Sequence, residues 1–193
     1  MGKTQSTITS ENLADLTRTT YCKHTHALTY NQWYQGFISE IPRGYLTAHD
    51  LNKLYEQYFP FGDTTTFTTL LFNLFDEDKD GRVMFDDYLR SLSIIARGKF
   101  AEKLVWSFRF YDIDNDGYIS REELLLATNA IYKMIENIAT HPEDEDTPAK
   151  RVDKLFSLMD TNKDGKIDLD EYCIGVKSDP FMIQSLFLYD GHI

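Results

Sequence analysis

The segment DIDNDGYISREE, at residues 112–123, recurs in two variants, DEDKDGRVMFDD at 76–87 and DTNKDGKIDLDE at 160–171. Each places oxygen-bearing side chains at positions 1, 3 and 5, a glycine at position 6 and a carboxylate at position 12. This spacing is typical of a loop that wraps a calcium ion, which prefers six to eight oxygen ligands. Three occurrences, each flanked by apolar residues at helical spacing, predict three helix–loop–helix calcium-binding units, or EF-hands.

The candidate ligands follow from the positions in each loop. Short Asp and Asn side chains at positions 1, 3 and 5 converge on the ion, position 7 offers its backbone carbonyl, and position 12 offers a carboxylate. The glycine permits a sharp turn that a Cβ atom would obstruct. The predicted ligands are Asp76, Asp78, Asp80, Arg82 and Asp87 in the first loop, Asp112, Asp114, Asp116, Tyr118 and Glu123 in the second, and Asp160, Asn162, Asp164, Lys166 and Glu171 in the third.

The loop at 76–87 departs from the pattern at two positions. Position 12 is Asp87, one methylene shorter than the glutamate that normally binds through both oxygens, and position 9 is Met84, whose side chain is no ligand for a hard ion. We therefore expect this loop to bind Ca²⁺ more weakly, or to prefer six-coordinate Mg²⁺, so that the chain binds two to three Ca²⁺ ions.

EF-hands normally occur in pairs, and a fourth, degenerate repeat precedes the other three. Gly44 lies 37 residues before Gly81, and the surrounding segment 39–50 places Ile41 and Arg43 where ligand oxygens belong, with Pro42 between them. An arginine in the cage repels a cation, so this hand keeps the fold without the ion. The sequence predicts an all-α protein of four EF-hands in two lobes, 1–97 and 98–193, with short two-stranded β-bridges between paired loops.

Helix boundaries and the remaining loops are less strongly encoded. Thr29 with Gln32, and Ser120 with Glu123, have the spacing of a capping box at a helix start. Thr147-Pro148 and Asp179-Pro180 pair a capping residue with a proline in the first helical turn. The acidic segment 141–146 is expected to be a solvated loop.

The composition excludes several classes of protein. The formal net charge is −11, and the three acidic loops carry all of it, which disfavours a nucleic-acid partner. We expect no secretory signal and no membrane-spanning helix, and two reduced cysteines. Cys22-x-His24-x-His26 does not have the spacing of a structural zinc site, and no nucleophile–base motif is present, so we predict no enzyme activity.

The chain begins Met1-Gly2-Lys3-Thr4-Gln5-Ser6, which fits the motif for N-myristoylation of Gly2. One acyl chain gives only marginal membrane binding, and that suits a protein whose location is switched. We therefore expect a cytoplasmic protein that associates peripherally with membranes.

Further short motifs are distributed along the chain. They are Gln32–Phe37, Tyr58–Asp63, Phe72–Asp76, Arg97-Gly98, Glu102–Leu104, Thr147-Pro148 and Leu188–Gly191. In these motifs the chain resembles the neuronal calcium sensor family, and most closely its frequenin branch. Such a resemblance implies a calcium sensor that binds a target helix in a hydrophobic groove, lined by Trp33, Phe37, Tyr55, Tyr88 and Leu92, with residues 181–188 as an occupant when no target is bound. The targets that it implies are phosphatidylinositol 4-kinase, receptor kinases, exchange factors and channels, at the cytoplasmic face of the plasma membrane or Golgi.

Three alternatives to a sensor stay open at this point. A calcium buffer would bind ions without exposing apolar surface. A constitutive regulatory subunit, of a channel or a lipid kinase, would bind its partner with or without calcium. A calcium photoprotein is also a four-hand chain, but a count of two tryptophans, scattered histidines and a myristoylation motif argue against one.

Overall fold

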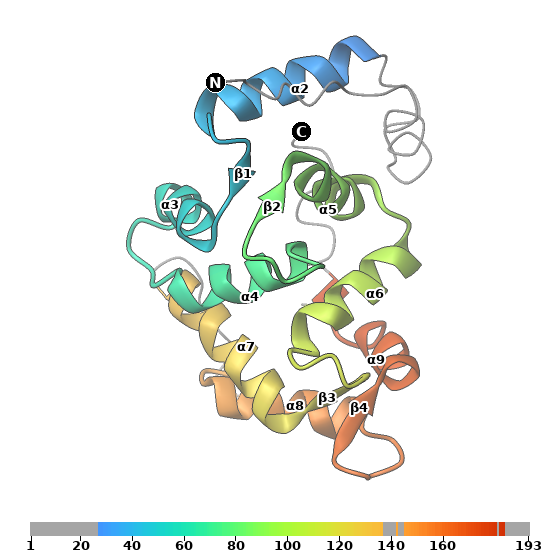
Figure 1. Cartoon of the computed structure of the whole chain (residues 1–193). Coiled ribbons are helices and arrows are strands. Elements are labelled where there is room, and N and C mark those ends of the chain that lie inside the picture. Colours follow the sequence, from blue (N-terminus) through green and yellow to red (C-terminus); the bar gives the residue numbers. More distant parts are fainter. Residues whose placement is uncertain (1–26, 137–141, 143–144, 181, 184–193) are drawn as a thin grey trace.

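Helices dominate the computed structural model, which describes residues 27–136, 142, 145–180 and 182–183 (Figure 1). The helices are α2 (Ala27–Glu40), α3 (Ala48–Tyr58), α4 (Thr65–Phe75), α5 (Phe85–Arg97), α6 (Phe100–Tyr111), α7 (Arg121–Ile135), α8 (Pro148–Met159) and α9 (Leu169–Val176). The strands are β1 (Tyr45–Leu46), β2 (Val83–Met84), β3 (Tyr118–Ser120) and β4 (Lys166–Asp168).

The short strands join the hands in pairs. Strand β1 pairs antiparallel with β2, and β3 pairs antiparallel with β4, so that Leu46 faces Val83 and Ile119 faces Ile167. These four residues stand at position 8 of their loops and are buried, so each bridge places an apolar pair between two loops. The predicted all-α fold of paired EF-hands with β-bridges is confirmed, and it includes the degenerate first hand.

Local capping explains where several helices begin. The Ser120 side chain accepts a hydrogen bond from the N–H of Glu123 at the start of α7, and Thr147 accepts one from Lys150 at the start of α8. Asp179 likewise accepts a hydrogen bond from the N–H of Met182, at 2.8 Å. The prediction for Thr29 is wrong, because α2 already begins at Ala27 and Thr29 lies within its first turn.

The two pairs of hands pack against each other along α4, which lies beside α6 and α7 (Figure 1). The ring centroids of Phe67 and Phe110 are 5.5 Å apart, and the buried apolar residues form one cluster that includes members of both pairs. At a second contact the N–H of Asp63 donates to the Lys133 carbonyl at 3.1 Å. Beside it, a Cβ atom on Gly62 would come within 1.9 Å of the Met134 carbonyl oxygen.

Helix α5 ends at Arg97 and α6 begins at Phe100, which fits the expected link between the hand pairs. The division into lobes at residues 97 and 98 stays a prediction, because the buried cluster runs across it. Within the described residues no helix is long and apolar enough to cross a membrane.

Candidate metal centres

The three acidic loops share one backbone conformation. Their position-6 glycines, Gly81, Gly117 and Gly165, have φ angles of 79°, 89° and 82°. The residues at position 4, two before each glycine, also have positive φ, near 60°, and these are Lys79, Asn115 and Lys163. Two left-handed residues in a six-residue arc turn the chain tightly enough for alternate side chains to face the same point.

The turn brings the predicted acidic ligands of two loops together. Carboxylate oxygens of Asp76, Asp78 and Asp80 lie within 4.8 Å of one another, and those of Asp112, Asp114 and Asp116 form a second group with the same limit. In the fourth hand Asn162 stands at position 3, and its side-chain amide donates to Asp164 at 3.0 Å. Asp160 at position 1 of that hand accepts the N–H of Asp164 at 3.1 Å.

The first aspartate of each of the first two acidic loops carries an oxygen that suits a cation. Asp76 and Asp112 are each only 5% exposed, and one oxygen of each accepts the N–H of the loop glycine. Their other oxygens, Asp76 Oδ1 and Asp112 Oδ1, are buried and have no hydrogen-bond partner among the residues that the structure describes. A buried carboxylate oxygen without a partner is costly, and a hard cation among neighbouring carboxylates would satisfy it. The residues present therefore fit Ca²⁺.

Electrostatics at Asp112 point the same way. Burial raises the pKa of Asp112, the other carboxylates of its loop raise it further, and the hydrogen bond from the Gly117 N–H opposes this rise. Carboxylates held this closely repel one another, and a bound cation would remove that repulsion.

The position-12 glutamates of the third and fourth hands reach across their loops. Glu123 Oε1 accepts the N–H groups of Ile113 and Asp114, and its Oε2 accepts the N–H of Ser120. Glu171 makes the equivalent bonds with Thr161, Asn162 and Asp168. Burial favours a higher pKa for both glutamates, but these hydrogen bonds outweigh it and the pKa of each lies below its ordinary value.

The position-12 residue of the second hand behaves differently. Among the described residues, Asp87 makes no bond across its loop and accepts only the N–H of Met84, three residues earlier. Burial raises the pKa of Asp87, and that one hydrogen bond does not offset it. The shorter side chain thus bonds only to the start of its own helix, and position 12 of this loop is not connected to the residues at the beginning of the loop.

The first hand differs at position 4. All three acidic loops have a left-handed residue there, but in the first hand the position is Pro42, whose ring holds φ near −65°. Gly44 keeps a φ of 84°, so only part of the turn is retained. In the sequence, Pro42 stands between the two lost ligand positions, and the φ angles of the other loops give the physical reason that this arc cannot close around an ion.

Comparison with known proteins agrees with this geometry. Family models of an EF-hand domain pair match residues 42–94 and residues 101–177. Neuronal calcium sensor 1 of Lymnaea stagnalis and that of Aplysia californica are each 45% identical to the chain over 191 residues, which covers 99% of this chain and 98% of theirs. The chain belongs to the neuronal calcium sensor family. The family resemblance drawn from the sequence is confirmed, and with it a calcium sensor that is not an enzyme.

In this neuronal calcium sensor, the residues expected in the target groove differ in exposure. Trp33 is 41% exposed, whereas Phe37, Tyr55, Tyr88 and Leu92 are half-buried. The Phe37 ring lies 5.9 Å from the Tyr88 ring, and Tyr55 lies 5.4 Å from Phe67, centroid to centroid. Four of the five are thus partly enclosed by the first pair of hands. Of the segment 181–188 only residues 182 and 183 are described, and Gly2, Cys22, His24 and His26 lie outside the described residues.

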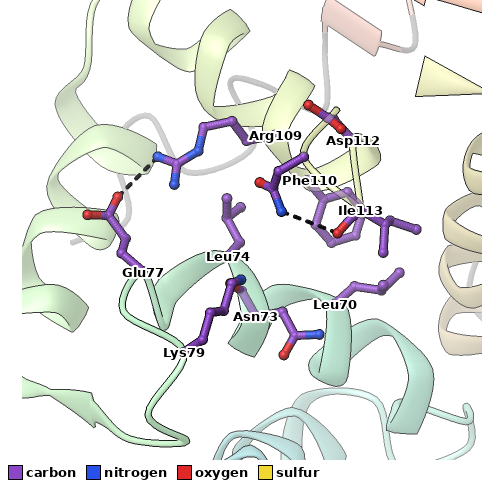
Figure 2. A pocket seen from close by; sticks show the side chains of 10 residues that line it. Leu70, Asn73, Leu74, Glu77, Lys79, Arg109, Phe110, Asp112 and Ile113 are labelled. Carbon is purple, nitrogen blue, oxygen red and sulfur yellow. Dashed lines mark hydrogen bonds and ion pairs between the residues drawn. The ribbon is translucent and has the colours of Figure 1, made fainter. Parts of the chain in front are cut away.

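A small pocket lies where the second and third hands meet. Its volume is about 150 Å³, and it is lined by both loops and by α4 and α6. Figure 2 shows Arg109 reaching from α6 to Glu77, the second residue of the second hand's loop, with an Nη1–Oε1 distance of 3.1 Å. Lys79 from the same loop donates to the Asn73 carbonyl at 2.6 Å. Glu77, a loop residue that is not a candidate ligand, therefore links the loop of the second hand to α6, the helix that leads into the loop of the third hand.

The prediction of a solvated loop at 141–146 is wrong at Glu145. This residue is buried, and its carboxylate pairs with Arg151 and Lys154 of α8. Arg151 also binds Asp179 through two hydrogen bonds of 2.8 Å. Sequence reasoning missed this network, although Arg151 stands four residues before Leu155 and eight before Met159, on the buried stripe of α8.

Proposed function

We propose that the second, third and fourth hands bind Ca²⁺ through the residues at loop positions 1, 3, 5, 7 and 12. The observation that carries this proposal is the pair of buried carboxylate oxygens on Asp76 and Asp112, which have no hydrogen-bond partner within the described part of the chain and belong to two groups of close carboxylates. Ca²⁺, when bound, supplies the positive charge that these oxygens lack. The ligand set is the one given by the sequence, with backbone carbonyls from Arg82, Tyr118 and Lys166.

The exit helices can convert binding into movement. Glu123 and Glu171 stand in the first turns of α7 and α9, so a shift of either carboxylate is transmitted to the whole helix. Helix α7 in turn packs on α4, and the carbonyl of Lys133 near its far end accepts the Asp63 N–H. A change at the third hand would thereby reach the first pair of hands, where the expected target groove lies.

We propose that the second hand is the weakest of the three sites. It would either prefer Mg²⁺ or bind Ca²⁺ only at high concentration. Asp87 stays with Met84 at its own helix start, whereas Glu123 spans its loop. We expect Asp87→Glu to raise Ca²⁺ affinity at this hand by roughly tenfold or more, because the longer side chain can bring both carboxylate oxygens to the ion. Calorimetric titration measures it, with Asp87→Asn as the variant of matched size; unchanged affinity in Asp87→Glu would refute the proposal.

We further propose myristoylation at Gly2, peripheral association with the cytoplasmic face of the plasma membrane or Golgi, and target binding in the groove around Trp33. The start motif and family membership support these steps. Candidate targets are phosphatidylinositol 4-kinase, receptor kinases, exchange factors and channels. Intact mass after co-expression with an N-myristoyltransferase tests the modification, with Gly2→Ala as its control.

One experiment separates the sensor from its alternatives. Acylated protein is used as bait in calcium and in chelator, and apolar surface is followed in parallel with a fluorescent dye. A sensor retains a partner and exposes apolar surface only in calcium. A partner retained equally in both conditions identifies a constitutive subunit, and calcium binding without new apolar surface identifies a buffer. The double variant Glu123→Gln and Glu171→Gln serves as the control with impaired calcium binding at the third and fourth hands.

A further inference from the structure

The first hand has lost its ligands but keeps part of the architecture of a filled loop. Its glycine, Gly44, has a φ of 84°, inside the range of the three acidic loops. The N–H of Thr47 at position 9 donates to Asp50 at position 12 at 2.7 Å, as Ser120 donates to Glu123 at 2.9 Å in the third hand. The second half of this loop therefore has the same backbone turn and the same bond between positions 9 and 12 as the loop of the third hand.

A cation is present in this half of the loop, and it belongs to the chain. The Arg43 guanidinium donates through Nε to the Tyr45 carbonyl at 3.0 Å and through Nη2 to the Thr47 hydroxyl at 3.3 Å. The same Nη2 forms an ion pair with the Asp50 carboxylate. Tyr45, Thr47 and Asp50 stand at positions 7, 9 and 12, which are ligand positions in a calcium loop.

We propose that the Arg43 guanidinium is the resident cation of the first hand and takes over the structural role of Ca²⁺ there. A carbonyl, a hydroxyl and a carboxylate from three separated positions converge on one positive group. They are the kinds of oxygen that would coordinate a Ca²⁺ ion at these positions. Because an arginine remains protonated at every physiological pH and is covalently tethered, this hand stays filled whether or not calcium is present.

Tyr45 connects the resident cation to the second hand. The Cζ atoms of Arg43 and of Arg82 lie 5.1 Å and 4.9 Å from the centroid of the Tyr45 ring. Tyr45 pairs with Met84 across the β-bridge, and Arg82 stands at position 7 of the second loop. A first loop that always contains its cation thus holds β1 in register against β2. This pairing preorganises the loop of the second hand for ion binding, where the position-12 residue, Asp87, is short.

An ordinary surface ion pair would not have these properties, and the chain offers one for comparison. Arg121 pairs with Asp153 and lies 5.6 Å from the Phe156 ring centroid, but both charged side chains are at least half exposed. The Arg43 side chain is itself 43% exposed, but its partner Asp50 is only 19% exposed and accepts bonds from both the N–H and the hydroxyl of Thr47. Arg121→Gln is therefore the matched control for Arg43→Gln.

The test is amide hydrogen exchange at residues 44–47 of the full-length protein in chelator. If Arg43 is the resident cation, Arg43→Gln speeds exchange there by roughly tenfold, because a charge-assisted set of bonds is lost. Arg121→Gln leaves this segment within a factor of two, and Arg43→Lys falls between the two because a lysine keeps the charge without the fork. Exchange within a factor of two of the wild type in Arg43→Gln would overturn the proposal.

Two further variants test the pairing of the two charges directly. Asp50→Asn removes the carboxylate partner, and the double variant with Arg43→Gln removes both charges. A resident cation predicts that the double variant exchanges more slowly than Arg43→Gln alone, because no carboxylate is left without its cation. Additive effects of the two substitutions would overturn the proposal. The chelator readout does not involve calcium at the other hands, so failure here is separable from failure of the proposed calcium sites.

Discussion

Replacing Arg151 by methionine tests a group of enclosed charges that join α8 to Glu145 and Asp179. The Arg151 side chain is 4% exposed and that of Asp179 is 5% exposed, and Arg151 Nη1 also lies 2.5 Å from Glu145 Oε2. In Arg151→Met, Glu145 keeps its pair with Lys154, whereas Asp179 loses both of its bonds to the guanidinium and keeps the bond from the Met182 N–H. A buried carboxylate that loses its cation is strongly destabilising.

We expect a loss of about 3–5 kcal/mol in the free energy of unfolding, the range found when one partner of a buried ion pair is removed. For a chain of this size each kcal/mol lowers Tm by about 2–4 °C, so the expected drop is roughly 6–20 °C. Calorimetry in chelator measures it, because bound calcium would stabilise all variants by mass action. Arg121→Gln, with its exposed ion pair, is expected to cost about 0–1 kcal/mol. A drop in Arg151→Met no larger than in this control would refute the reasoning.

Three further predictions follow from single features. Gly62→Ala should destabilise the contact with α7 and lower Tm, because the new Cβ meets the Met134 carbonyl oxygen at 1.9 Å; Gly36→Ala, where a Cβ meets nothing within 4 Å, should not. Glu171→Gln should weaken calcium binding at the fourth hand by at least tenfold in a calorimetric titration and leave the third hand within a factor of two. Burial raises the pKa of Asp179 but its bonds with Arg151 lower it more, so its stabilisation is present above the ordinary carboxyl pKa and lost as pH falls through the lowered one. Acid unfolding followed by circular dichroism should show that loss in the wild type and a smaller one in Arg151→Met.

The repeating loops could be predicted from the sequence because a calcium loop encodes its geometry locally. The glycine at position 6 and the cap at Ser120 act within twelve residues, and an apolar residue recurs at position 8 of every loop; the structure has the expected turns, bridges and helix start. The Thr29 cap failed for a local reason as well. A threonine–glutamine spacing marks a helix start only when the preceding residues leave the helix, and here α2 begins at Ala27.

The features that sequence reasoning missed depend on residues far apart in the chain. Glu145 is acidic, and nothing beside it indicates that Arg151 and Asp179 close over it. The pair between Arg109 and Glu77 joins two hands whose relative placement no motif encodes. Arg43 was recognised as repelling a cation, but its contacts with Tyr45 and Asp50 appear only when the loop is folded. In each case a charge at a seemingly unfavourable position has partners that the fold supplies.

The left-handed residue at position 4 has a consequence for how this chain can change. Introducing acidic side chains for Ile41 and Arg43 would supply ligands, but Pro42 between them would still prevent the backbone from closing the arc. Replacing Pro42 first would relax the loop while an arginine still occupied it. A calcium-binding first hand therefore requires a change at Pro42 as well as at the ligand positions, and replacing Arg43 alone gives up its bonds to Tyr45, Thr47 and Asp50 before any ion can compensate. A single substitution therefore cannot convert this hand into a calcium site.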